Sequence, residues 1–235
     1  LGGDLTAAAE AAEWAEAYKE GKKLTTSCCP AFVNMIKQHY PMLLDQMSTT
    51  VSPMCAVSRM IKEKDPETIT VFIGPCIAKK SESLDLNIKD NADYALTLIE
   101  AEAMMAAKGI TLEPEENVYQ AGSVFGKRFG NGGGVTAAVL ECLKETGENT
   151  EIEVMKCNGA AECKKALTLL KAGRLPADFI EGMACVGGCV GGPGRFANEN
   201  QAKKARDLLI GQADKRGVHE NLENQGLTEV AMHRH

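Results

Sequence analysis

The chain has 235 residues, 44% hydrophobic and 25% charged, a composition typical of a globular protein that buries a core as one domain or two lobes. Its formal net charge of −6 argues against nucleic acid as a partner, because phosphate binding requires clustered Lys and Arg. No apolar run approaches the ~20 residues needed to cross a bilayer, so the sequence predicts no membrane insertion.

The predicted elements alternate between helices and strands. The first is an Ala-rich helix at 6–20, which Thr6 or Asp4 could cap and Gly21 ends. Pro30 begins a second helix. The later elements are a helix after 52–53, strands at 68–74 and 92–97, helices at 98–109 and about 135–145, a strand at 151–157, a helix at 161–173 and a strand at 178–185. This alternation predicts an α/β fold.

Two of these elements carry further expectations. The strand TITVFIG (68–74) precedes Cys76, which therefore follows a carboxyl end of a strand, where ligands collect in open α/β sheets. On the helix at 98–109 we interpret Met104 and Met105 as core residues that fill gaps between larger side chains.

Two glycine-rich runs invite a nucleotide-binding interpretation that their spacing does not support. In GNGGGVTAA (130–138) Val135 occupies the slot of the third glycine, and in GSVFGKR (122–128) no Ser or Thr follows Lys127. We favour instead a tight turn that packs closely against another backbone.

The cysteine count points to metal or thiol chemistry. The N-terminus, LGGDLTAAAE, lacks an initiator Met and the basic and apolar regions of a secretory signal, so we expect a cytoplasmic protein cut from something longer. Nine cysteines are many for such a chain, and the number is odd. Disulfide frameworks usually belong to short secreted chains with even numbers of cysteines, whereas clustered thiols in a reducing compartment are more often ligands or catalytic groups.

Three cysteine groups lie at the ends of predicted elements, in TTSCCP (25–30), GPC (74–76) and EGMACVGGCVGG (181–192). Small neighbours let thiolates converge and leave backbone N–H groups free to bond sulfur. A zinc site usually pairs two cysteine knuckles or adds His at fixed spacing, and here there is one close pair and no HExxH. Widely separated single cysteines favour an iron–sulfur cluster, with zinc and a disulfide as the alternatives.

Taken together, TSCCPAFV (26–33), GPCIAKK (74–80) and EGMACVGGCVGG resemble the three signature motifs of FeFe hydrogenases, in the same order and with similar separation. The resemblance runs from about Leu1 through the third motif and more loosely to the C-terminus. It implies two lobes of twisted β-sheet flanked by helices, with the metal cluster site between them. Residues 1–235 would then be the C-terminal portion of an H-cluster-binding catalytic domain. The N-terminal part of that domain and any ferredoxin-like domains would lie outside the chain, and such a fragment need not be active alone.

The family's cofactor is the H-cluster, a 4Fe–4S cubane joined through a cysteine to a diiron subsite with CO, cyanide and a dithiolate bridge. By motif position, the resemblance implies the cubane ligands Cys29, Cys76, Cys185 and Cys189, with Cys189 shared between the cubane and the diiron subsite. It places Lys79 against a cyanide ligand through a charge-assisted hydrogen bond. It also places Met183 and Phe125 beside the cofactor.

The resemblance further implies a proton path. Cys28 corresponds to the family's proton-donating thiol, and the relay continues through Glu10, Ser48 and Glu13. Glu10 and Glu13 share one helix face. Acidic helix faces are usually only solvated, so both interpretations of this pair remain open. Ala17 stands where an arginine often completes the path, so the outer exit is expected to differ.

Several positions depart from the family pattern, namely Phe32 for Trp, Gly74 for Met, Met54 for Gln, and Pro193 within the glycine run. The ligand, lysine and thiol positions are all retained. The departures therefore indicate a divergent subgroup with altered rate or bias, rather than loss of cluster binding.

The resemblance predicts an iron–sulfur redox enzyme that reversibly reduces protons to H2, or takes up or senses H2. Ferredoxin or another electron carrier and dedicated maturation proteins would be its partners. The alternative is a non-catalytic hydrogenase-like 4Fe–4S protein of cytosolic iron–sulfur cluster assembly, which shares the cubane ligands but carries no diiron centre. Cys28, Lys79 and the Glu10–Glu13 pair favour the enzyme, because a cubane-only protein needs neither a relay nor a cyanide anchor. A third interpretation is a zinc-stabilised binding module.

Four cysteines receive no role in this scheme. Cys55 and Cys142 are interpreted as buried core residues, since free cysteines usually behave as small hydrophobes. Cys157 and Cys163 could bind a ligand, although a strand end and a helix face also explain them.

Overall fold

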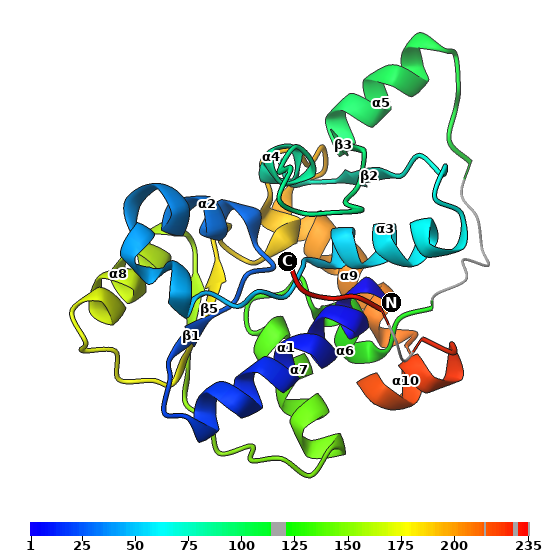
Figure 1. The fold of residues 1–235 in the computed structure, drawn as a ribbon. Coiled ribbons are helices and arrows are strands. Elements are labelled where there is room, and N and C mark those ends of the chain that lie inside the picture. Colours follow the sequence, from blue (N-terminus) through cyan, green and yellow to red (C-terminus); the bar gives the residue numbers. More distant parts are fainter. Residues whose placement is uncertain (114–120, 214, 228–229, 235) are drawn as a thin grey trace.

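The structure, a computed structural model, describes residues 1–113, 121–213, 215–227 and 230–234 (Figure 1). Its α-helices are α1 Gly2–Lys19, α2 Pro30–His39, α3 Pro53–Lys64, α4 Ala78–Ser83, α5 Leu98–Ala107, α6 Val124–Arg128, α7 Gly134–Glu145, α8 Ala160–Lys171, α9 Glu199–Gly211 and α10 Val218–Asn224. Its strands are β1 Leu24–Thr25, β2 Val71–Gly74, β3 Tyr94–Thr97, β4 Val154–Asn158 and β5 Phe179–Met183, and 3-10 turns lie at η1 Pro41–Gln46 and η2 Cys189–Gly191.

The larger lobe is built on a parallel three-stranded sheet in the order β1-β5-β4. The central strand, β5, is buried along its whole length, as expected of a parallel strand covered on both faces. Phe179 joins the core formed with α1 and α7, and the next residue, Ile180, joins the core formed with α2 and α8. The ring of Trp14 on α1 stacks on Phe179 with centroids 4.3 Å apart and fixes α1 against the sheet.

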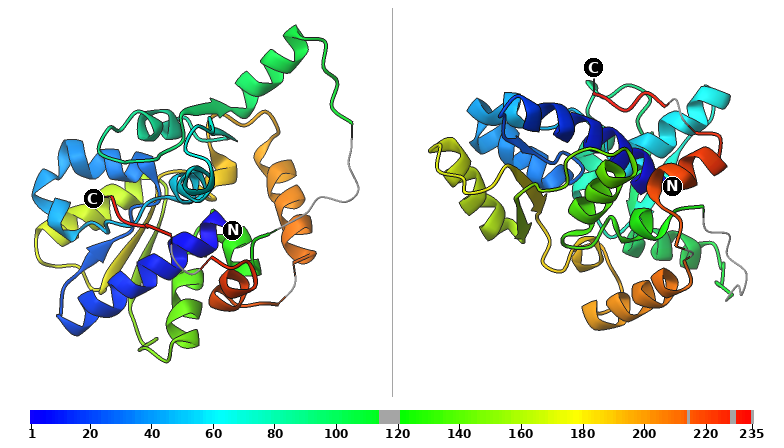
Figure 2. Two further views of the ribbon diagram at one scale, coloured as in Figure 1. Left: turned by 45° about the vertical axis from the view of Figure 1, so that its right-hand side comes forward. Right: turned by 90° about the horizontal axis from the view of Figure 1, so that it is seen from below.

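The smaller lobe contains the parallel pair β2–β3, in which Gly74 lies opposite Thr97. One face of this pair is apolar and exposed, with Val71, Ile73 and Tyr94 each about half or more exposed. Helix α5 projects away from the rest of the molecule in two views (Figures 1 and 2). The interpretation of Met104 as a core residue is therefore wrong, because its side chain is 58% exposed on this projecting helix.

The first helix begins four residues earlier than predicted, at Gly2, so neither Thr6 nor Asp4 is its cap. The Thr6 hydroxyl donates to the Val51 carbonyl at 3.2 Å, and the Asp4 carboxylate accepts from the Ser123 N–H at 2.9 Å. A Cβ on Gly2 would lie 2.5 Å from a backbone oxygen of Pro53, so only glycine allows this approach of α1 to α3. Polar residues that resemble caps instead connect α1 to distant segments.

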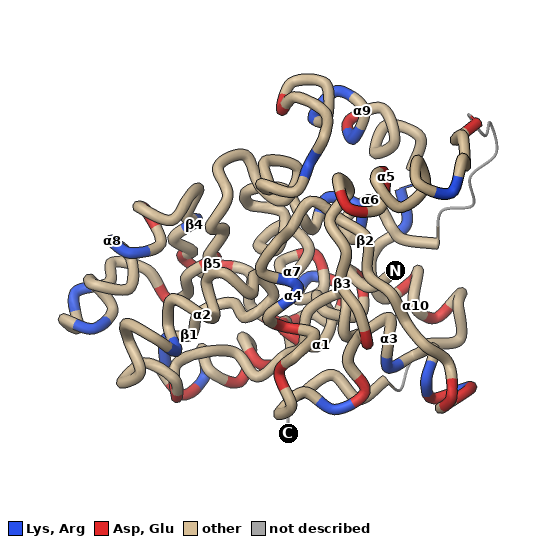
Figure 3. Tube along the Cα trace, turned by 90° about the horizontal axis from the view of Figure 1, so that it is seen from above, with Lys and Arg blue, Asp and Glu red and all other residues tan. Residues whose placement is uncertain are grey.

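The prediction of an α/β fold with two lobes of parallel sheet flanked by helices is confirmed. The sequence did not reveal the short elements β1, α4, α6 and α10, nor the 13-residue helix α9. Within the described residues, no helix is both long and apolar enough to cross a membrane. Lys and Arg are interspersed with Asp and Glu over these elements (Figure 3).

Candidate metal centre

A cavity of about 260 Å³ lies where the carboxyl ends of β2 and β5 meet. It is lined by every cysteine of the three motifs, namely Cys28, Cys29, Cys76, Cys185 and Cys189. All nine cysteines of the chain are described, and each is a free thiol. Three segments spread over residues 28–189 thus deliver their thiols to one place, as their positions at the ends of predicted elements indicated.

The first two motifs place their thiols at the starts of helices. Cys29 is the N-cap residue of α2, with extended backbone at φ −92° and ψ 105°. Cys76 lies two residues before α4. Burial raises the pKa of the Cys76 thiol, and backbone N–H groups of Lys79 and Ala78 oppose the rise by hydrogen bonding to sulfur. Helix N-termini favour thiolates, which is the form that binds metal.

The third motif is held against the glycine-rich run at 130–134. The Cys189 N–H donates to the Gly130 carbonyl at 2.7 Å. Gly188 has φ +84°, and a Cβ there would lie 2.3 Å from that same Gly130 oxygen. The run is therefore a turn packed against another backbone, as the failed nucleotide spacing indicated. Burial raises the pKa of the Cys189 thiol to about 12.

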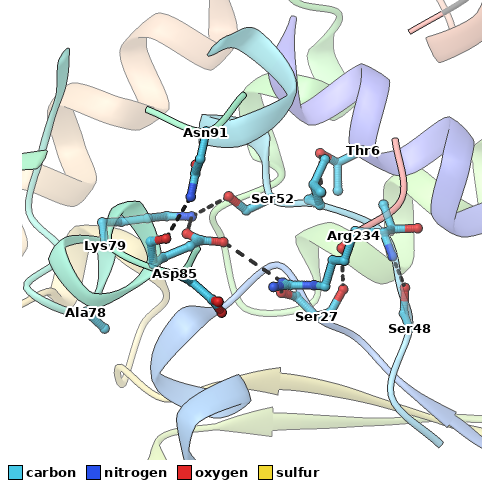
Figure 4. Close-up of polar contacts among 12 residues, drawn as sticks. Thr6, Ser27, Ser48, Ser52, Ala78, Lys79, Asp85, Asn91 and Arg234 are labelled. Atoms are coloured by element: carbon cyan, nitrogen blue, oxygen red, sulfur yellow. Dashed lines mark hydrogen bonds and ion pairs between the residues drawn. The ribbon is translucent and has the colours of Figure 1, made fainter. Parts of the chain in front are cut away.

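Lys79 brings a buried positive charge to the cavity (Figure 4). Its ammonium lies 2.6 Å from a Glu82 carboxylate oxygen and donates to the Ser52 hydroxyl at 2.7 Å. Burial lowers the pKa of Lys79, but Glu82 more than offsets that effect, so the pKa is raised. The ammonium therefore stays charged and can still donate to an anionic ligand, because it carries three N–H bonds.

Arg234, near the C-terminus, supports both the first and the second motif (Figure 4). Its guanidinium donates to the Ser27 carbonyl at 2.9 Å and lies 4.0 Å from Glu82. The loop that carries the Cys28 thiol is thereby tied to the Lys79–Glu82 pair. The spacing of Lys79 and Glu82, three residues apart on one helix, could have revealed their pairing. Nothing local in the sequence points to Arg234.

The methionine and the phenylalanine expected beside the cofactor, Met183 and Phe125, lie in different surroundings. Met183 lines the cavity, at the end of β5. Phe125 packs against the core of the larger lobe, whereas Phe129, one turn further along the chain, lines the cavity. Phe129 was missed because the sequence offers two phenylalanines at helical spacing.

Of the expected relay residues, Glu13 and Ser48 are in direct contact. The Ser48 hydroxyl donates to one Glu13 oxygen, and the Thr49 N–H donates to the other at 2.9 Å. Burial raises the pKa of Glu13, but hydrogen bonds from Ser48, Thr49 and Thr50 outweigh burial and lower it. This carboxylate is not on a solvated helix face.

An exposed imidazole completes this group of contacts. The ring of His233 lies 2.8 Å from the Thr49 hydroxyl and 3.7 Å from a Glu13 oxygen, and its side chain is 52% exposed. Ala17, in the expected position of an arginine, is buried and carries no polar group. The solvent-exposed polar group beside Glu13 is therefore His233 of the C-terminal segment rather than a residue of α1.

Glu10, one turn before Glu13, is fully buried, and neither of its carboxylate oxygens finds a hydrogen-bond partner among the described residues. Burial raises its pKa well above the ordinary value, and the charges of Glu13 and Glu181 raise it further, while the charge of Arg234 opposes the shift. The charge of Glu10 also raises the pKa of the Cys28 thiol, next after burial itself. Burial thus favours the protonated form of Glu10, which lies one turn before Glu13 on α1.

We expect a Glu10→Gln variant to gain stability relative to the parent as the pH rises. Because the folded pKa of Glu10 exceeds its unfolded value of about 4.3, folding takes up a proton above that pH, so the parent loses stability from there upward. Gln does not titrate. The stability difference between variant and parent should therefore grow between about pH 4 and about pH 8, by about 1.4 kcal/mol for each unit by which folding raises the pKa of Glu10.

Urea unfolding at both pH values measures this change. A Glu16→Gln variant on the exposed side of α1 is the control and should show no such trend. If the free energies of unfolding of Glu10→Gln and the parent differ by the same amount at both pH values, Glu10 has the same pKa in the folded and the unfolded chain.

Comparison with known proteins identifies the family. The model of the iron-only hydrogenase large subunit, C-terminal domain, matches residues 1–193. The chain is 32% identical over 213 residues to the periplasmic Fe hydrogenase large subunit of Nitratidesulfovibrio vulgaris, which covers 72% of this chain and 51% of that protein. It is 29% identical over 276 residues to iron hydrogenase 1 of Clostridium pasteurianum, which covers 94% of this chain and 48% of that protein.

More distant similarity extends to a different class of protein. The chain is 24% identical over 243 residues to the cytosolic Fe-S cluster assembly factor narfl of Xenopus tropicalis, covering 81% of this chain and 51% of that protein. The chain therefore spans about half the length of the curated relatives it matches.

Solved structures agree with the sequence comparison. The FeFe-hydrogenase HydA(deltaEFG) superposes with a TM-score of 0.74 at 24% identity, over 99% of this chain and 80% of that one. A variant of HydA1 from Chlamydomonas reinhardtii gives a TM-score of 0.76 at 23% identity with the same coverage. At these identities the likeness establishes the fold. Together with the family match over most of the chain, it shows that this protein belongs to the iron-only hydrogenase large-subunit family and carries that family's C-terminal domain.

Proposed function

We propose that residues 1–235 form the cluster-binding portion of a hydrogenase catalytic domain. The observation that carries this proposal is the convergence of five thiols and one buried ammonium on a single cavity. In this proposal Cys29, Cys76, Cys185 and Cys189 hold a 4Fe–4S cubane, and Cys189 also reaches a diiron subsite.

The residues present fit such a cofactor. Four cysteine thiolates are the usual ligand set of a 4Fe–4S cluster. The cavity wall is formed largely by small residues and backbone, and a Cβ on Gly192 would lie 2.4 Å from the Pro75 oxygen. The buried ammonium of Lys79 offers a charge-assisted hydrogen bond to an anionic ligand of the diiron unit. Met183 and Phe129 close the cavity with apolar surface.

When bound, the H-cluster would supply the redox centre at which H2 is formed or split. The chain's own residues would move the accompanying proton. Cys28 lines the cavity and can accept or donate a proton at its sulfur. The buried carboxyl of Glu10 would exchange that proton with Ser48, and the Ser48 hydroxyl already donates to Glu13. We place the outer end of the path at His233, whose ring lies beside both Thr49 and Glu13 and reaches solvent.

The proposal includes H2 and protons as substrates, ferredoxin or another carrier as the electron partner, and maturation proteins that load the diiron unit. We also propose a cytoplasmic, reducing setting, because all five cavity thiols must stay reduced to bind metal. A use in H2 sensing with little turnover is compatible with the same site.

A second candidate function rests on the more distant relatives. Two proteins named as cytosolic Fe-S cluster assembly factors match this chain at 22% and 24% identity. A chain with that role would need the four cubane thiolates but no proton path. The contacts around Glu13 and the buried Lys79–Glu82 pair favour the hydrogenase, since a protein that held only a cubane would have no use for either.

The deciding experiment is an infrared spectrum after anaerobic cubane reconstitution and loading with a synthetic diiron complex. Metal-bound CO and cyanide absorb in a window that is otherwise empty of protein bands. We expect a sharp set of bands in the parent and shifted or weakened bands in Lys79→Ala, while Lys80→Ala, whose partner is the exposed Glu100, leaves them unchanged. A cubane without those bands, also after the upstream part of the domain has been restored, would favour the assembly-type function.

A further inference from the structure

Away from the cavity, two helices bring together a thiol, a carboxylate and an imidazole. Cys142 and Glu145 lie three residues apart on α7, and His219 is the second residue of α10. The Cys142 sulfur, a Glu145 oxygen and a His219 ring nitrogen all lie within 4.8 Å of one another. None of the three lines the cavity of the cysteine motifs.

We propose that Cys142, Glu145 and His219 form a Zn²⁺ site that fastens α10 to α7. An ion at the centre of three atoms 4.8 Å apart would lie about 2.8 Å from each, and Zn²⁺ requires about 2.3 Å to sulfur and about 2.0–2.2 Å to nitrogen or oxygen. Side-chain movements of about 0.5–0.8 Å therefore complete the site. Binding displaces the thiol proton of Cys142 to solvent, and a water molecule fills the fourth tetrahedral position.

The ligand types select the metal. Mg²⁺ and Ca²⁺ prefer oxygen ligands throughout, whereas a thiolate with an imidazole and one carboxylate suits Zn²⁺. The surroundings of Cys142 also attract a cation. Burial raises the pKa of its thiol, and the charges of Glu145, Asp4 and Glu141 raise it further. The same negative charges that disfavour a bare thiolate stabilise a divalent ion.

The three side chains are held in place by contacts independent of any metal. One Glu145 oxygen accepts from the N–H groups of Val218 and His219, each at 3.1 Å, which fixes the carboxylate at the start of α10. Asn221 anchors α10 by donating to Asp4 at 2.9 Å. Helix capping accounts for the carboxylate alone. It does not account for the buried thiol and the imidazole beside it, and these complete a ligand set.

Zinc retention and X-ray absorption test the site on the full chain, after cubane reconstitution has filled the motif thiols with iron. We expect about one Zn²⁺ per chain after desalting, with one sulfur at about 2.3 Å and three nitrogen or oxygen neighbours near 2.0 Å. His219→Ala should weaken Zn²⁺ binding by at least about 100-fold, because loss of even an outer-shell partner costs 10–100-fold. Cys142→Ser should remove the sulfur neighbour.

His39→Ala, at an exposed histidine outside the proposed site, is the matched control and should retain zinc. The proposal is overturned by a four-sulfur shell, which would place zinc in the motif cysteines. It is equally overturned if His219→Ala and Cys142→Ser both retain as much zinc as the parent. It is also overturned if the parent retains no zinc. If the cubane cannot be loaded, the same spectrum on a Cys76→Ala, Cys185→Ala double variant decides the question, because its motif thiols cannot supply four sulfurs.

Discussion

A Cys28→Ala variant should keep the cluster and lose at least about 100-fold in H2 turnover. The thiol lines the cavity, is only 8% exposed and is close enough to Glu10 for that carboxylate to raise its pKa. A positioned acid or base contributes about 10²–10⁴-fold to a proton transfer, and alanine removes it. Turnover with a reduced dye as electron donor, measured beside the infrared bands of the loaded protein, separates loss of proton transfer from loss of the cofactor.

Cys55→Ala is the matched control, because Cys55 is also buried and lies outside the cavity wall. It should leave turnover within about twofold. If Cys28 and Glu10 act in one relay, the Glu10→Gln variant should be similarly slow, and the double variant should be little worse than either, since residues that act as a unit are not additive. Full turnover by Cys28→Ala with intact bands would remove Cys28 from the path.

A Cys76→Ala variant should lose the cubane itself. Cys76 is the proposed ligand from the smaller lobe, while Cys29, Cys185 and Cys189 come from segments attached to the larger one. After anaerobic reconstitution, iron should fall from about four per chain to well below one, and the broad visible absorbance should disappear, because a 4Fe–4S cluster normally needs four thiolates.

Cys163→Ala, at a buried thiol outside the cavity, should bind iron as the parent does. Comparable unfolding temperatures of the two apo variants would show that neither substitution has disrupted the fold. If Cys76→Ala retains the full iron content and absorbance, the proposed ligand set is wrong, and the smaller lobe supplies no cluster ligand through Cys76.

The sequence was most informative where chemistry restricts the residue type. Three cysteine groups at element ends predicted convergence on one site, and the alternation of strands and helices predicted the sheet architecture. Both rest on local patterns, since a glycine or proline beside a thiol and a β-branched run are visible without knowledge of tertiary structure.

Other features depended on contacts between distant segments. The acidic residues of α1 left a solvated face and a relay both open, and Glu10 is fully buried, which no local pattern reports. Arg234 reaches Ser27 across 207 positions of the chain. Met104 was misjudged for the opposite reason, because an apolar helix is recognisable in the sequence whereas the exposure of the Met104 side chain on it is not.

Trp14, stacked on Phe179, provides an intrinsic fluorescence probe of the protein. Trp14 is the single tryptophan of the chain, is fully buried and lies one turn from Glu10 on the helix that flanks the cavity wall. Its fluorescence therefore reports one environment, free of the averaging that several indoles would cause. Because iron–sulfur clusters absorb across the emission range of tryptophan, loading the cavity should quench this emission, and unfolding of α1 from the sheet should shift it to the red. Cofactor insertion and folding can thus be followed separately, in real time and without a label.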